Sequence, residues 1–97
     1  MESKRKFVVL LGTEDAAVSK KIIDFLNEKG WRWWHNLPNS WLLVLHSDTI
    51  KAQDLRDNIR EAIGIDILFV LEVVGNGWSA RLKSNTIEWL KYTWDDT

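Results

Sequence analysis

The chain has 97 residues, of which 45% are hydrophobic and 28% are charged. That length fits one small domain with a single core, here residues 1–97. Thirteen basic residues against fourteen acidic ones leave a formal charge of -1, which argues against a dedicated polyanion binder. The absence of cysteine excludes disulfides and zinc knuckles. No apolar run is long enough for a membrane span and no signal-type segment starts the chain, so we expect a cytoplasmic protein with no membrane partner.

The first predicted elements are a strand and a helix. Residues 6–11 form a continuous apolar run, which is typical of a buried strand. Thr13 can cap the following helix, with Glu14 and Asp15 in its first turn, where the helix dipole favours acids. Apolar residues then recur at helical spacing up to Gly30, which suits the left-handed position after a helix.

A hairpin comes next. Residues 31–36 are rich in aromatic side chains, and residues 41–45 are apolar throughout, so both are predicted strands. The intervening residues 37–40 contain Pro38, Asn and Ser, which are typical of a turn.

A second helix, a fourth strand and a C-terminal helix complete the prediction. The second helix begins at a cap on Asp48 or Thr49 and ends at Gly64. Residues 65–74 form the fourth strand, and residues 84–94 form the C-terminal helix.

This order predicts an α+β fold, a ferredoxin-like βαββαβ sandwich with a four-stranded antiparallel sheet, plus a C-terminal helix. Two helices cover only one face of such a sheet, whereas the first and third strands are apolar on both faces. An uncovered stripe of this kind would rival the largest apolar patch of a typical monomer, about 300–600 Å².

The second face therefore requires a cover, either the C-terminal helix or a second copy of the chain. We prefer the second copy, a homodimer docked face to face, because one short helix covers little of a four-stranded sheet. The predicted dimer-interface residues are Val8, Leu10, Leu42, Val44, Leu68 and Val70.

Several segments resemble a known family. Residues 34–43, 54–57, 71–75, 77–78 and 85–91 resemble the SinR-type family of small bacterial proteins. That family is similar to the smaller, dimeric protein of the CRISPR adaptation complex. The resemblance spans residues 7–91 and implies a ferredoxin-like homodimer in a prokaryotic or phage setting.

The resemblance also bears on catalysis. Relatives with nuclease activity end their first strand with Tyr-Asp, whose aspartate can hold a divalent metal with its mate across the dimer axis. The matching positions here are Leu11 and Gly12, which offer no side-chain oxygen to a hard cation. His35 and His46 lack the partners of a recognisable triad, and the glycine turn at residues 75–77 lacks the lysine of a phosphate loop. We therefore predict no catalytic residue, no metal and no cofactor.

The predicted function is a small non-catalytic homodimeric interaction module, in the phage or anti-phage setting that the resemblance suggests. The alternative is a single-stranded nucleic-acid binder, or a metal-dependent endonuclease or endoribonuclease of the CRISPR-related type. An amino-acid-binding regulatory module ranks last, because the loop after the first strand has no proline. The candidate residues for binding a protein partner or nucleic acid are Lys4, Arg5, Lys6, Trp31, Arg32, Trp33, Trp34, Trp41, Trp78, Arg81 and Lys83.

Overall fold

A four-stranded sheet organises the chain. The computed structural model describes residues 2–95. Its strands are β1 (Lys4–Leu11), β2 (Arg32–Leu37), β3 (Ser40–His46) and β4 (Leu68–Val73). They lie in the order β2-β3-β1-β4, and every neighbouring pair is antiparallel. The predicted α+β class and the four-stranded antiparallel sheet are therefore confirmed.

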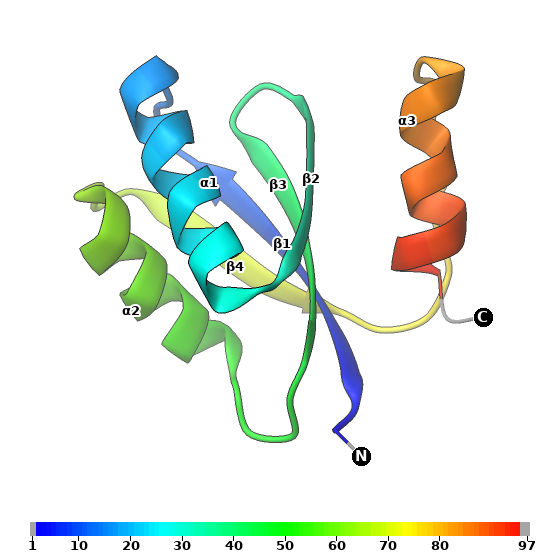
Figure 1. Cartoon of the computed structure of the whole chain (residues 1–97), viewed down its shortest axis with the longest axis horizontal. Helices are drawn as coiled ribbons and strands as arrows, with labels where there is room; N and C mark the ends of the chain where they lie inside the picture. The colour runs from blue at the N-terminus through cyan, green and yellow to red at the C-terminus, as the bar shows by residue number, and fades with distance from the viewer. Residues whose placement is uncertain (1, 96–97) are drawn as a thin grey trace.

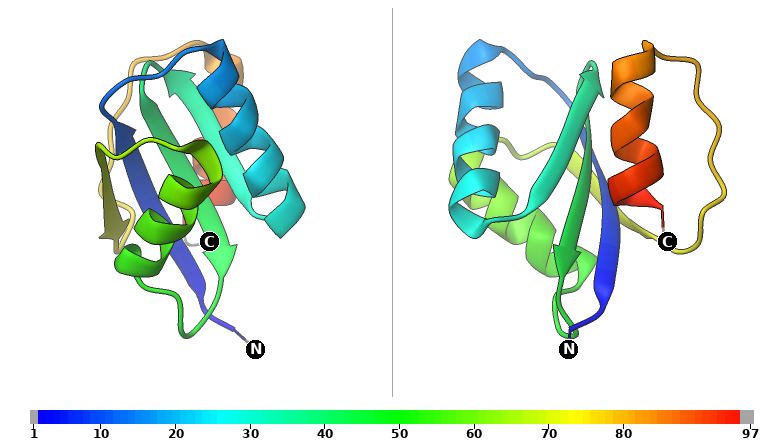
Figure 2. Two further views of the ribbon diagram at one scale, coloured as in Figure 1. Left: turned by 90° about the vertical axis from the view of Figure 1, so that its left-hand side faces the viewer. Right: turned by 45° about the vertical axis from the view of Figure 1, so that its right-hand side comes forward.

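The helices lie on both sides of this sheet (Figure 1). Helices α1 (Ala16–Lys29) and α2 (Ala52–Ile63) cover one face. Helix α3 (Ser84–Trp89) continues without a break into the π-helical turn η1 (Leu90–Trp94), and the two lie against the opposite face (Figure 2). We call residues 74–95, which run from the end of β4 through η1, the tail.

Both helix starts differ from the sequence prediction. Asp15, rather than Thr13, caps α1, because its extended backbone lets its carboxylate accept from the backbone N–H of Val18 at 2.9 Å. Helix α2 starts at Ala52, later than the predicted cap. The hydroxyl of Ser47 accepts from two backbone N–H groups of the preceding turn, which holds that turn outside the helix.

The helix-side core lies between the sheet and helices α1 and α2. Alternate residues of β1 and β3 point into it, as the twofold period of a strand requires. Its fully buried members include Phe7, Val9, Leu26, Trp41, Leu43 and Leu55.

A second core lies on the other face, between the sheet and the tail. Trp34, Val44, Leu90 and Trp94 are buried there, with Val8, Leu42, Val73, Trp78, Leu82 and Trp89 packed around them. The tail thus covers much of the sheet face that α1 and α2 leave uncovered. This second cover explains why β1 and β3 are apolar on both sides.

The structure corrects the predicted face of β4. Leu68 and Val70 were expected on the second face, but both pack against the helix-side core. The reason is the strand register, which places Val70 beside Val9 and Leu68 beside Leu11, and both β1 residues are buried on the helix side. Strand β4 is also shorter than the predicted residues 65–74, since it begins at Leu68.

Gly12 provides a test of the packing at the end of β1. Its backbone N–H donates to the carbonyl of Ile67 at 2.8 Å, and an added Cβ would lie 2.7 Å from Cγ2 of Ile67. Gly12→Ala should therefore lower the free energy of unfolding by about 1–3 kcal/mol, as overpacking does. Urea denaturation measures this value.

Gly77→Ala is the matched control, because nothing lies within 4 Å of a Cβ at Gly77. It should change the free energy of unfolding by less than about 0.5 kcal/mol. Equal unfolding midpoints for the two variants would contradict the close approach of Gly12 to Ile67.

Candidate functional site

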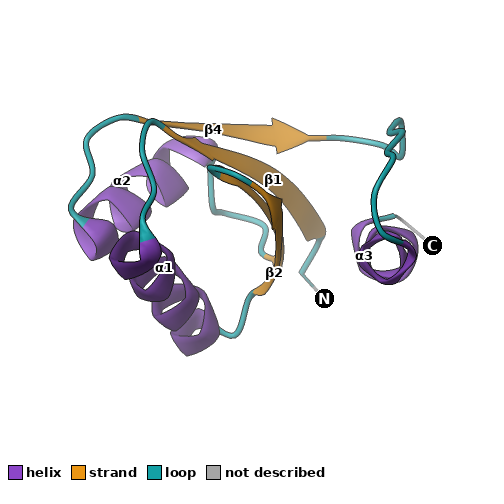
Figure 3. Cartoon of the chain, turned by 90° about the horizontal axis from the view of Figure 1, so that it is seen from above, coloured by secondary structure: helices purple, strands orange, loops and turns teal. Residues whose placement is uncertain are grey.

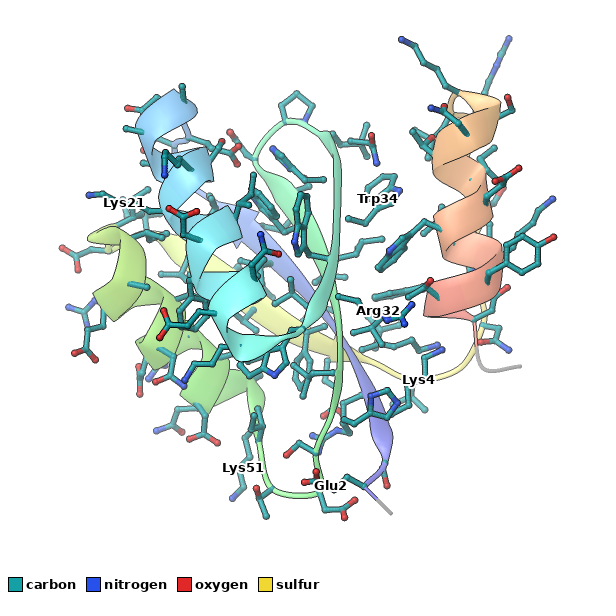
Figure 4. The ribbon with its side chains drawn as sticks, viewed as in Figure 1. Glu2, Lys4, Lys21, Arg32, Trp34 and Lys51 are labelled. Atoms are coloured by element: carbon teal, nitrogen blue, oxygen red, sulfur yellow. The ribbon has the colours of Figure 1, made fainter. Side chains whose placement is uncertain are left out.

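The main concave feature of the tail side is an apolar groove of about 590 Å³. We call it the tail-side groove. Strand residues form one wall and tail residues form the other. The wall residues that matter most below are Val8, Leu10, Leu42, Trp78, Leu82 and Leu90. Trp34 projects from β2 toward the C-terminal helix (Figure 4) and lines the groove.

Hydrogen bonds fix the tail wall in place. The indole N–H of Trp34 donates to the carbonyl of Thr86 at 3.1 Å. The Trp78 indole donates to the carboxylate of Asp95, which holds the loop before α3 against the end of η1. The groove therefore lies between the sheet and the tail of one chain, and hydrogen bonds hold the tail in position.

Two lysines of β1 also hold the tail. Lys6 is buried with 3% of its surface exposed, and its ammonium donates to the carbonyl of Gly75. The same ammonium lies 5.4 Å from the ring centroid of Trp94, within the range of a cation–π interaction. Lys4 donates to the carbonyl of Asp95 at 2.6 Å (Figure 4). Lys4 and Lys6, which were predicted to bind nucleic acid or a protein partner, thus make structural contacts within the chain.

Arg5 points to the helix side and pairs with Glu72 of β4. It also donates to the carbonyl of Ser47 at 3.2 Å. The hydrogen bond from the guanidinium lowers the pKa of Glu72, and the same bond raises the pKa of Arg5. All three basic residues at the start of β1 are therefore engaged within the chain.

The predicted tryptophans do not form one surface. Trp31, Trp33 and Trp41 belong to the helix-side core. Trp34 and Trp78 belong to the tail-side core. The remaining candidates, Arg32, Arg81 and Lys83, are exposed. Of the eleven predicted binding residues, Trp34, Trp78 and Arg81 come together, at the tail-side groove.

The predicted dimer-interface residues are also divided. Leu10 and Leu42 line the groove together with Val8, whereas Val44 is buried beneath the tail. Leu10 is 40% exposed and remains partly open to solvent.

Glu14 organises a polar cluster on the helix side. Its carboxylate accepts from the Trp41 indole at 3.0 Å and from the Ser19 hydroxyl, and it lies 2.7 Å from Nε2 of His35. The His35 ring stacks on Trp41 with centroids 3.9 Å apart, and its Nδ1 lies 2.8 Å from the carbonyl of Ser40. Both ring nitrogens are occupied, so the cluster ties α1 to the hairpin and leaves His35 no free nitrogen for a substrate.

The end of β1, where the predicted resemblance would place a metal-binding aspartate, has no space and no side-chain oxygen for a metal ion. Leu11 is buried, and Gly12 lies against Ile67. Within residues 2–95, no three His, Cys, Asp or Glu side chains gather closely enough to share a metal ion. None of the helices formed by these residues combines the length and the apolar character that crossing a bilayer requires.

Comparisons with known proteins found no matching family model, no matching curated protein and no matching solved structure. The resemblance to the SinR-type family therefore stays a prediction.

Sequence reasoning missed part of the site. Ala80 and Leu82 line the groove, and Val73 completes the strand wall. The dense series of tryptophan and leucine residues between positions 78 and 94 was the signal for a segment that packs over apolar surface, but it does not say which strand the segment meets.

The Arg5–Glu72 pair gives a pH-dependent prediction. Because the pKa of Glu72 is lowered in the folded state, the pair stabilises the fold above the ordinary glutamate range, and this contribution is lost as pH falls through the folded pKa. Glu72→Gln should therefore unfold with a weaker dependence on pH between about pH 6 and about pH 3 than the unsubstituted chain. Thermal unfolding at a series of pH values measures the slope.

Asp24→Asn is the control, since it removes a pair with Lys20 in which both side chains are largely exposed. Its pH profile should match that of the unsubstituted chain. If Glu72→Gln gave that same profile, the Arg5–Glu72 pair would contribute nothing to stability.

Proposed function

We propose that this chain is a small interaction module without catalysis of its own, and that its tail-side groove binds an apolar segment of a partner protein. The observation that carries the proposal is the groove itself. Aromatic and aliphatic side chains line it, one hydrogen bond attaches the tail to β2, and another joins two parts of the tail. Grooves of this kind bind with little loss of conformational entropy on the protein side.

A protein segment suits the groove better than a small molecule. Within the groove Leu37 is 48% exposed, and the apolar surface continues beyond the groove from Leu10 to its β4 neighbour Phe69, which is 59% exposed. A small ligand would leave that continuation in water, whereas an extended or helical segment can cover it. Trp78 supplies an aromatic wall, and aromatic anchors dominate the energetics of protein interfaces.

Basic side chains at the tail-side groove indicate which charge the partner segment carries. Arg81 lines the groove and makes no ion pair with any other residue in the described range 2–95. Lys83 follows two residues later and is exposed. The complementary segment therefore carries large apolar side chains and at least one carboxylate.

We also propose that the architecture is ferredoxin-like. In support, α1 connects β1 to β2, and α2 connects β3 to β4, and each connection passes over one intervening strand. This is the split β-α-β arrangement, repeated in one sheet. The C-terminal helix is then an addition on the second face.

The other functional predictions have less support. Trp34 and Trp41 are buried, so neither is free to stack on a base of single-stranded nucleic acid. A face-to-face homodimer would have to use a sheet face that the tail already covers over Val44. Nucleic-acid binding, nuclease activity, the homodimer and the phage setting stay predictions.

Selection from a displayed library of random peptides tests the groove. We expect enriched peptides that share large apolar residues and an acidic residue, and that shift the tryptophan fluorescence of the chain when they bind. Ala80→Trp, which fills the groove, should weaken binding by at least about tenfold, equivalent to about 1.4 kcal/mol. Arg81→Glu should weaken it severalfold, with a larger effect at low salt.

Ala62→Trp is the matched control, because Ala62 is exposed on α2, on the other face of the sheet. It should leave the affinity unchanged. Selected peptides that share no pattern, or that bind Ala80→Trp as tightly as the unsubstituted chain, would refute the groove as the binding site.

A further inference from the structure

The two edges of the sheet differ in how they are protected. At the β2 edge, the pairing with β3 is irregular between Trp34 and Leu37, and Pro38 follows directly. Irregular pairing and proline are devices that prevent an edge strand from pairing with another chain. Strand β2 also carries the exposed charge of Arg32. The β2 edge is therefore protected against pairing with a strand of another chain.

The β4 edge has neither the irregular pairing nor the proline. Its sequence, Leu-Phe-Val-Leu-Glu-Val, contains no proline, lysine or arginine, and its pairing with β1 runs without interruption. The single charge, Glu72, is already paired with Arg5. Within the described residues, no segment lies on the outer side of β4 (Figure 3). An uninterrupted apolar edge of this kind is a template for strand addition.

The register identifies the free backbone groups. Gly12 donates to the carbonyl of Ile67, so the alternation of an antiparallel ladder directs Phe69, Leu71 and Val73 toward β1. The backbone groups of Leu68, Val70 and Glu72 then point outward. These three alternate residues offer a short row of backbone donors and acceptors to a further strand.

We propose that the β4 edge pairs with the β4 edge of a second copy of this chain, antiparallel across a twofold axis at Val70. This inference does not rest on the proposed function of the groove. The twofold matches Val70 with Val70 of the partner subunit and Leu68 with Glu72 of the partner subunit. All outward backbone groups of both strands are then satisfied.

Side chains on the tail side favour the same arrangement. Phe69 is 59% exposed and Ile67 is 74% exposed in the single chain. In the proposed register Phe69 lies opposite Leu71 of the partner subunit, and Ile67 lies opposite Val73 of the partner subunit. Cross-strand pairs of aromatic and branched residues stabilise a sheet, and Ile67 of the partner subunit would extend the strand wall of the tail-side groove.

Charge and symmetry select a second copy as the occupant. Helix α2 packs beneath β4, and its two arginines are paired, Arg60 with Asp66 of the following loop at 2.7 Å and Arg56 with Asp57 at 2.9 Å. The surface of α2 beside β4 thus carries both positive and negative charges, so that two copies do not present each other with charge of a single sign. Because the β2 edge is protected against strand pairing, assembly stops at a dimer and no filament grows.

Sedimentation across micromolar to submillimolar concentrations tests the proposal. The unsubstituted chain should show a reversible monomer–dimer equilibrium with no larger species. Phe69→Lys places a charge on the edge and should raise the dissociation constant by about tenfold or more. Tyr92→Lys is the matched control, because Tyr92 is a 79% exposed aromatic residue of η1, and it should leave the equilibrium unchanged.

A chain that stays monomeric throughout, an open series of larger oligomers, or a dimer that Phe69→Lys leaves intact would each overturn the proposal. Circular dichroism confirms that the substituted chains are folded.

Disulfide capture tests the register even if Phe69→Lys weakens folding. The chain has no cysteine of its own, so single substitutions give unique thiols. Residues 69 and 71 of the two copies face each other as a non-hydrogen-bonded pair, with Cα atoms about 4.5 Å apart, within the range of a disulfide. A mixture of Phe69→Cys and Leu71→Cys should therefore form mainly the mixed disulfide. Equal or greater amounts of the two homodisulfides would refute this register.

Discussion

The sheet is apolar on both faces, and a four-stranded sheet of this kind needs a cover on each side. Phe7 and Trp41 face the helices, whereas Val8 and Val44 face the tail. A fully buried apolar side chain contributes roughly 1.5–3 kcal/mol. The tail-side core therefore contributes an amount comparable to the whole net stability of a small domain, about 5–15 kcal/mol. The tail belongs to the fold and is not an appendage to it.

The buried charge of Lys6 explains how the cover stays in place. An isolated buried ammonium would be costly, so it needs partners close by. The tail supplies them, through the carbonyl of Gly75 and the ring of Trp94. Because those partners exist only when the tail is docked, the lysine favours the docked arrangement. A basic run that suggests nucleic-acid binding in the sequence serves here as an internal anchor.

The sequence predicts the elements well and their partners less well. Hydrophobic periodicity and the glycines at positions 30 and 64 locate both long helices, and both glycines adopt the left-handed conformation that follows a helix. The orientation of β4 was not predictable, because it is largely apolar on both sides and only the pairing of Val70 with Val9 decides which side meets the helices.

The same limit applies to the candidate site. Apolar strand residues indicated that something covers the second face, and the sequence analysis favoured a second copy of the chain over the C-terminal helix. Only the docking of Leu90 and Trp94 on Val44 shows that the chain supplies that cover itself.

The groove and the exposed apolar side chains beside it share one geometric origin. The tail covers the second face over Trp34 and Val44, but it leaves Leu10 40% exposed and Phe69 59% exposed. A single short helix is narrower than a four-stranded sheet, so its packing leaves one side of the face uncovered (Figure 2). On that side the tail loop and the strands form the groove, and β4 keeps an unpaired edge next to it. A tail wide enough to cover the whole face would bury Leu10 and would leave no room for the groove.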